Sequence, residues 1–244
     1  MTISKLECIV DSRSGRSRLL LVVAGVALFI AVGPLDFARG RPAAQQPSIV
    51  SGRVQIGIPV AARRPTNAYG RTVGTPKLAA ESERRHVVVY LRDAKPQPVT
   101  AMRAQVRQRD ENFVPRVVAV TVGSEVEFPN DDPIYHNVFS LSRARNFDLG
   151  RYPRGETRSV RFDKPGIVKV FCQIHSHMAS TVMVFDHPWF AVPTEDGRFE
   201  LPAMPAGERL ITAWHERLGD TTLRVRVEAG RPITADFVLP VPEL

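Results

Sequence analysis

Residues 166–185 read GIVKVFCQIHSHMASTVMVF. Residues 168–170 alternate apolar and polar side chains, the period of a half-buried β-strand, and 181–185 form a second strand-like apolar run. The loop between them carries a thiol, two imidazoles and a thioether, at Cys172, His175, His177 and Met178. This stretch therefore predicts a strand, a loop of metal-ligating side chains and a closing strand.

Similar strand patterns recur upstream of this stretch. They occupy residues 87–91, 117–122, 126–128, 136–139 and 160–162, and no long helical periodicity follows residue 50. Short strands separated by Gly and Pro turns are typical of a Greek-key β-sandwich. Residues 94–112 are mostly polar, with few large apolar groups, among them Met102 and Val106. We predict an all-β fold.

A second group of strand patterns lies near the two ends of the chain. Residues 49–54 indicate a short strand with a glycine, and alternating or apolar runs follow at 198–201, 210–214, 223–227 and 234–239. These patterns predict a small second antiparallel β-sandwich. Residues 57–82, rich in Arg, Pro, Gly and Thr, are expected to form a long surface loop.

The N-terminal 40 residues resemble a targeting segment. Four basic residues precede the apolar run Leu19–Val32, as in the charged and apolar regions of a signal peptide. The run is shorter than the roughly 20 residues that span a bilayer. We expect residues 1–40 to be a signal peptide for export to the periplasm, with an uncleaved N-terminal anchor as the alternative. Residues 41–48 form a polar linker.

Charge and cysteine content narrow the function. The net charge of +8 suits an acidic protein partner or an anionic membrane. The sequence has no Lys/Arg run interleaved with aromatic residues, so nucleic acid is not an expected partner. Cys8 precedes the apolar run and would leave with the signal peptide, so Cys172 would be the only remaining cysteine. A single cysteine cannot form an internal disulfide and is either a free thiol or a ligand.

A further imidazole, His136, lies upstream of the loop in NDDPIYHNV, residues 130–138. One Cys, two His and one Met are the ligand set of a trigonal copper site with a weak axial sulfur. The predicted ligands of one mononuclear copper ion are His136, Cys172, His175 and Met178. Asn137 is expected to hydrogen-bond across the site and tune the thiolate. Zinc is disfavoured, because Met is a poor zinc ligand and only one Cys is available.

Each of these residues also has a simpler interpretation. Cys172 could be a buried free thiol, His136 a core histidine and Met178 a gap-filling side chain. His177 is interpreted as a surface residue, with an alternative ligand as the other option. The residues flanking Cys172 are not histidines, so a multicopper oxidase centre is not expected, and the chain carries no serine-triad, Walker-type or HExxH pattern. We expect no enzymatic activity.

The ligand spacing resembles a known family. His136-Asn137 followed by Cys172-x2-His175-x2-Met178 resembles the cupredoxin (blue copper) family in its shorter-loop, amicyanin-like form. FDLGRY at 147–152 and FDKPG at 162–166 are similar to plastocyanin-like methylamine utilisation proteins. The resemblance implies that His136, Cys172 and His175 are equatorial ligands and Met178 is axial. It also implies that His175 lies at the exposed edge as the electron port.

A second resemblance concerns the outer segments. SGRV at 51–54, VVVYL at 87–91, EDGRF at 195–199 and MPAG at 204–207 resemble carboxypeptidase regulatory-like β-sandwiches. The order of these motifs suggests that a copper domain, residues 92–187, is inserted into one discontinuous sandwich formed by residues 49–91 and 188–244.

Together these features predict a periplasmic type 1 copper protein that carries one electron between redox partners. Residues 143–169 hold eight Lys/Arg against three acidic residues. They form either a solvated face or a docking surface for an acidic redox partner near His175. The alternatives are a non-redox copper binding or delivery protein, and a β-sandwich scaffold in which metal is incidental. Membrane contact is expected only if the N-terminal segment is uncleaved.

Overall fold

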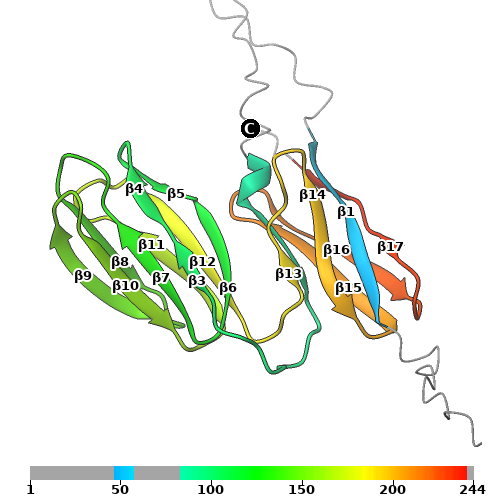
Figure 1. The fold of residues 1–244 in the computed structure, drawn as a ribbon. Coiled ribbons are helices and arrows are strands. Elements are labelled where there is room, and N and C mark those ends of the chain that lie inside the picture. The colour runs from blue at the N-terminus through cyan, green and yellow to red at the C-terminus, as the bar shows by residue number, and fades with distance from the viewer. Residues whose placement is uncertain (1–46, 58–82, 241–244) are drawn as a thin grey trace, which may run out of the picture. The chain divides into compact units, whose positions relative to one another are not determined.

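The computed structural model describes residues 47–57 and 83–240 of the chain. Within these ranges the regular structure is β-strand apart from one 3₁₀ turn, η2 (Arg84–His86) (Figure 1). The prediction of an all-β fold is therefore confirmed. No helix in these ranges is long and apolar enough to cross a membrane. The predicted signal peptide, most of the predicted linker and nearly all of the predicted loop at 57–82 lie outside the described residues.

The first sandwich contains the central part of the chain. Its larger sheet has the strand order β6 (Val117–Thr121), β12 (Ala179–Phe185), β11 (Gly166–Phe171), β8 (His136–Leu141) and β9 (Asn146–Tyr152). Its smaller sheet has the order β10 (Thr157–Phe162), β7 (Ser124–Pro129) and β3 (Arg103–Gln105). Two further strands, β4 (Arg107–Arg109) and β5 (Asn112–Val114), pair with each other as a hairpin.

Alternating side chains of these strands form the first core. Its fully buried members include Val126, Phe128, Phe162, Val168 and Val170. Each such side chain contributes roughly 1.5–3 kcal/mol by leaving water. Cys172 and Met178 belong to the same cluster. Both ends of the metal-ligand loop are thus fixed to the core.

The polar segment 94–112 contains strands that its sequence pattern does not reveal. β3, β4 and β5 are each three residues long, and β4 and β5 each bury one side chain, Gln108 and Phe113 respectively. Asp110 and Glu111, in the turn between β4 and β5, have φ angles of 52° and 54°. Strands this short cannot show a two-residue period, so their position depends on pairing with β7 and with each other.

The second sandwich has two four-stranded sheets. In one, β1 (Ser48–Gly57) pairs with β14 (Arg198–Met204), β17 (Ile233–Thr234) and β18 (Phe237–Pro240). The other has the order β13 (Phe190–Ala191), β2 (Val87–Leu91), β15 (Gly207–His215) and β16 (Gly219–Val227). The strands that precede residue 92 therefore pair with strands that follow residue 187.

The pairing of β1 differs from the expected purely antiparallel arrangement. β1 is antiparallel to β14 but parallel to β17 and β18, and the run predicted at 234–239 is divided between these two strands. Ala235, between them, donates its N–H to the carbonyl oxygen of Ser51 at 2.8 Å. A Cβ at Gly52 would collide with the carbonyl oxygen of Ala235, so this close approach requires glycine.

Candidate metal centre

The loop after β11 positions the thiol. Cys172 directly follows the strand, and the loop closes through two backbone hydrogen bonds. The N–H of Met178 donates to the carbonyl of His175 at 3.0 Å, and the N–H of Cys172 donates to the carbonyl of Met178 at 3.3 Å. This closure brings His175 Nδ1 to 3.9 Å from the buried Cys172 Sγ.

Strand β8 brings in the second imidazole. β8 pairs with β11 through Phe139 and Phe171, and its antiparallel direction places its first residue, His136, near the end of β11. His136 Nδ1 lies 4.0 Å from Cys172 Sγ and 3.1 Å from His175 Nδ1. Three of the predicted ligands, from two separate segments, therefore converge.

The three atoms fit one metal ion. A point equidistant from atoms at these separations lies about 2.1 Å from each, within the roughly 2.0–2.3 Å that imidazole and thiolate keep from zinc. The two Nδ1 atoms and the thiol sulfur form one group of possible ligand atoms, all within 4.8 Å of one another. The residues present thus suit a first-row metal ion.

A carboxylate sets the protonation of His136. His136 Nε2 lies 2.8 Å from Asp132 Oδ2, so Nε2 carries a proton, and in the neutral ring the lone pair is on Nδ1, on the side of the thiol. Burial raises the pKa of Asp132, but hydrogen bonds from the Glu111 N–H, from His136 and from the Asp110 N–H outweigh it. The pKa of Asp132 is therefore below its usual value, and the side chain is an anion at neutral pH.

Asn137 connects the two ligand-bearing segments. Its Oδ1 accepts the N–H of Gln173, next to Cys172, at 3.3 Å. Its Nδ2 donates to Asp148 Oδ1 at 2.7 Å, and the same oxygen accepts the N–H of Gly150. No hydrogen bond to the sulfur itself is found for Asn137 in the part of the chain that the structure describes. Asn137 thus contacts the loop at the residue after Cys172, and its tuning of the thiolate stays a prediction.

The remaining loop residues occupy different environments. Met178 is fully buried in the core cluster that includes Cys172, in keeping with either an axial ligand or a gap filler. The His177 side chain is 58% exposed, and its Nε2 lies 3.9 Å from Glu111 Oε2. The His175 side chain is 19% exposed, and its Nε2 lies 4.0 Å from the same oxygen. His175 is thus the partly exposed member of the converging triad.

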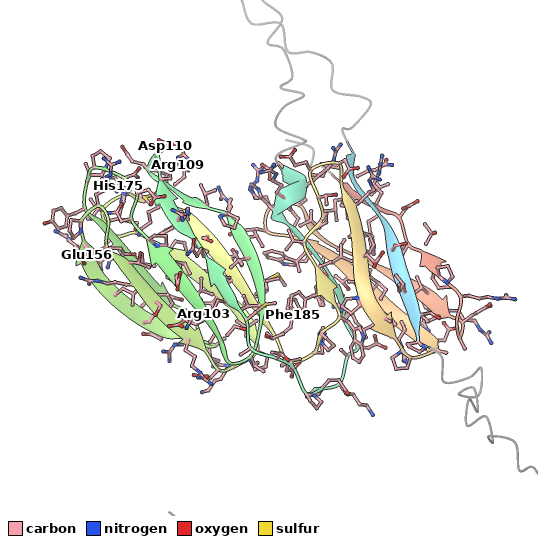
Figure 2. All side chains as sticks on the ribbon, viewed as in Figure 1. Arg103, Arg109, Asp110, Glu156, His175 and Phe185 are labelled. Carbon is pink, nitrogen blue, oxygen red and sulfur yellow. The ribbon has the colours of Figure 1, made fainter. Side chains whose placement is uncertain are left out.

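Two acidic residues at the site escaped the sequence reasoning. Asp132 has a usable signal, because it lies four residues before His136 within a stretch already singled out. Glu111 has none, because the β4–β5 hairpin that carries it shows no strand pattern. Figure 2 shows Asp110, in the same turn, at the same end of the sandwich as His175.

A second group of ligand-type side chains lies in the second sandwich. One ligand atom from each of Glu83, His86 and His215 lies within 4.8 Å of the others. His215 Nδ1 accepts the backbone N–H groups of Arg217 and Leu218 at 3.1 and 3.2 Å. Nδ1 therefore carries the lone pair and Nε2 the proton, which is donated to Glu83 Oε2 at 2.9 Å. His215 has no free lone pair for a metal.

Charge balance at this second group gives the same conclusion. Burial raises the pKa of Glu83, but His86 and Arg217 lower it below its usual value, so the carboxylate is ionised. Burial lowers the pKa of His215 and Glu83 opposes it only in part, so the imidazole is neutral. Arg217 also forms an ion pair with Glu83. These contacts define a closed hydrogen-bonded cluster that stabilises the fold.

The described residues thus define an all-β chain with a buried thiol–imidazole cluster, a candidate metal-binding β-sandwich. No protein-family model matches the chain, and no curated protein sequence matches it.

Several solved structures resemble part of the chain. The Cu-containing nitrite reductase from Thermus scotoductus SA-01 matches at 25% identity and a TM-score of 0.33, over 37% of this chain and 25% of the reductase. A purple cupredoxin from Nitrosopumilus maritimus matches at 22% identity and a TM-score of 0.31, over 34% of this chain and 99% of the cupredoxin. Amicyanin from Paracoccus versutus matches at 19% identity and a TM-score of 0.31, over 40% of this chain and 97% of amicyanin. The chain thus spans a quarter of the reductase's length.

Proposed function

We propose that this chain is a mononuclear copper protein that carries one electron between redox partners. One observation carries the proposal. The Nδ1 atoms of His136 and His175 and the buried Sγ of Cys172 converge at 3.1–4.0 Å, with the His136 lone pair directed inward. A soft thiolate combined with two imidazoles selects copper among the common metals.

Bound copper would supply a one-electron couple, because thiolate and thioether suit Cu(I) and imidazole suits both oxidation states. The protein contributes a fixed geometry. His136 is held by Asp132, and Cys172 is held by the core and by the closed loop. Ligands that cannot move need little rearrangement when the charge of the centre changes. Met178 is proposed as the axial sulfur donor.

The exposed edge of His175 is the proposed route for the electron. His175 is the partly exposed member of the triad, whereas His136 is completely buried. Ile134, Tyr135 and Ile174 are also exposed and directly precede or closely flank the two histidines in the sequence. Exposed apolar side chains next to the two histidines suit a transient redox partner, because electron-transfer encounters bury little surface.

The basic segment 143–169 supports an acidic redox protein as that partner. Arg151, in register with Asn137, places one of these charges near the ligands. Arg161 lies near the opposite end of β10, and Lys164 lies in the turn between β10 and β11. Lys169 is paired with Glu216. The proposed acidic contact therefore centres on β9 rather than on the whole segment. Partner charge would mainly alter the association rate and its salt dependence.

The remaining expectations stay part of the proposal. The chain is proposed to act in the periplasm, without catalysis of its own and with membrane contact only through an uncleaved N-terminal segment. Pairing of β1 with β14 and of β2 with β15 supports the inference that residues 49–91 and 188–244 form one discontinuous domain around residues 92–187.

Copper loading of the full chain tests this function. One equivalent of Cu(II) should give an intense thiolate-to-copper visible band, which one electron per copper bleaches and reoxidation restores. Tight copper binding without the band would indicate a delivery or storage protein instead. Binding no tighter than in Cys172→Ser would indicate a scaffold with incidental metal.

A further inference from the structure

Three donors converge on the carboxylate of Asp132. Its Oδ1 accepts the backbone N–H of Asp110 at 2.7 Å, and its Oδ2 accepts the backbone N–H of Glu111 at 2.9 Å. The same Oδ2 accepts His136 Nε2–H at 2.8 Å. The carboxylate is buried and thus joins the β4–β5 turn to a proposed metal ligand.

The backbone around Asp132 is built to hold this anion. Asp110 and Glu111 both have left-handed φ angles, 52° and 54°, which side-chain-bearing residues seldom adopt. Successive N–H groups in such turns form concave anion-binding nests. On the other side, the N–H of Asp132 donates to Asn130 Oδ1 at 3.0 Å. Asn130 Nδ2 in turn donates to the carbonyls of Ile134 and Tyr152, which fixes the loop before His136.

A carboxylate at this position has a chemical consequence for His136. An ionised carboxylate only accepts hydrogen bonds, so the neutral or metal-bound His136 ring has its proton on Nε2 and its lone pair on Nδ1. Such an outer partner fixes the ring orientation and raises the basicity of the ligating nitrogen. Greater basicity and nearby negative charge favour the more highly charged metal ion.

We propose that Asp132, clamped by the turn between β4 and β5, is a positioning residue that aims His136 and biases the site toward Cu(II). This inference rests on the proposed copper function. If the carboxylate served only to hydrogen-bond the β4–β5 turn, its loss would lower folding stability without changing the relative affinities for Cu(II) and Cu(I). A positioning role changes their ratio, and therefore the reduction potential.

Asp132→Asn is the test variant, and Asp131→Asn is its matched control. Both substitutions remove one negative charge from adjacent positions, but Asp131 is paired with Arg107 on the surface. Asparagine at 132 offers one oxygen and one N–H₂ group to three donors, so at least one donor loses its acceptor. Cu(II) affinity, Cu(I) affinity and reduction potential are measured on the full chain by competition and by redox titration.

Asp132→Asn should weaken Cu(II) binding by roughly 10–100-fold, as loss of such a partner typically does. Cu(I) binding should weaken less. Each tenfold difference between the two losses raises the one-electron potential by about 59 mV. Asp131→Asn should leave the ratio of affinities within about threefold of the wild type, because the contacts described for its carboxylate are with Arg107 rather than with His136. Equal shifts in the two variants would overturn the positioning role.

A measurement without copper keeps the inference testable even if Asp132→Asn does not fold. In the wild-type apo protein, NMR should show a downfield, exchange-protected imidazole N–H from His136 Nε2, in addition to the one expected from His215 Nε2 beside Glu83. A His136 ring protonated on Nδ1 alone would overturn the inference. This result is separable from the proposed function. A missing visible band in the copper-loaded wild type would contradict the proposed electron-carrier function. A normal band, together with equal Cu(II)-to-Cu(I) affinity ratios in Asp132→Asn and Asp131→Asn, would contradict only the role of Asp132.

Discussion

Two histidine clusters in this chain look alike in composition and differ in chemistry. His136, Cys172 and His175 converge in the first sandwich, and Glu83, His86 and His215 converge in the second. In the first, the far nitrogen of His136 is held by a carboxylate, which leaves a lone pair facing the thiol. In the second, backbone N–H groups already occupy the lone pair of His215.

The difference shows that proximity of ligand-type residues does not define a metal site. The hydrogen bond on the far side of each imidazole decides whether the near nitrogen can bind a cation. Counter-charge matters as well, since Arg217 already neutralises Glu83. The first cluster is open to a metal ion, and the second is complete without one.

The largest expected effect separates the two clusters by metal affinity. Cys172→Ser removes the thiolate and should lower Cu(II) affinity by more than the roughly 100-fold that loss of an outer partner can cost. The visible band should disappear. His86→Gln, in the second cluster, should change neither quantity. Copper titration followed by absorption measures both variants, and comparable losses in the two would contradict the distinction.

A smaller effect, on stability, should appear in the second cluster. Glu83→Ala leaves the buried Nε2–H of His215 without its acceptor, which should cost about 1–3 kcal/mol in the free energy of unfolding. Urea denaturation of the apo chain measures it, with an unchanged slope against denaturant. Glu111→Ala is the matched control, because Glu111 is exposed and lies 4.0 Å from His175 Nε2. It should stay within about 0.5 kcal/mol of the wild type. Equal losses of unfolding free energy in Glu83→Ala and Glu111→Ala would show that Glu83 is not a stabilising acceptor for His215.

The smallest expected effect concerns pH. The pKa of His215 is lowered mainly by burial, so the folded chain holds this imidazole neutral below the pH at which the unfolded chain protonates it. Its contribution to stability is therefore complete above about pH 6.5 and is lost as the pH falls below that value. The slope from this one group is at most about 1.4 kcal/mol per pH unit.

His215→Asn isolates this contribution. The asparagine oxygen can accept the backbone N–H groups that Nδ1 accepts, but it does not titrate. Between pH 7 and 5, unfolding free energies of the variant should fall less steeply than those of the wild type. His187, whose pKa is also lowered chiefly by burial, remains in both proteins and cancels in the difference. Parallel curves would mean that His215 is not held neutral.

The sequence allowed prediction where a pattern is long enough to repeat. β2 occupies the predicted residues 87–91, and β11 and β12 flank the predicted loop, because their alternation or apolar content is intrinsic to the strand. The meeting of His136 with Cys172 and His175 could be inferred from residue type and spacing. Their ligand roles, and that of Met178, stay predictions.

Other features depend on pairing between distant segments. β4 and β5 bury one residue each, so nothing local marks them as strands. The parallel approach of β17 and β18 to β1 is set by the register around Gly52 and Ala235. The role of Asp132 depends on hydrogen bonds from the β4–β5 turn, which is distant in the sequence and shows no strand pattern. The closed state of the Glu83 cluster depends on backbone groups that the sequence does not display.

X-ray absorption at the copper edge of the loaded full chain tests the central claim most directly, because it reports the atoms bound to the metal. The account predicts one copper ion per chain with one short sulfur contact from Cys172 and two imidazole nitrogens, at distances near the roughly 2.0–2.3 Å typical of such bonds. Loss of the sulfur contact in Cys172→Ser should follow. A copper ion surrounded only by nitrogen and oxygen in the wild-type chain would contradict the account.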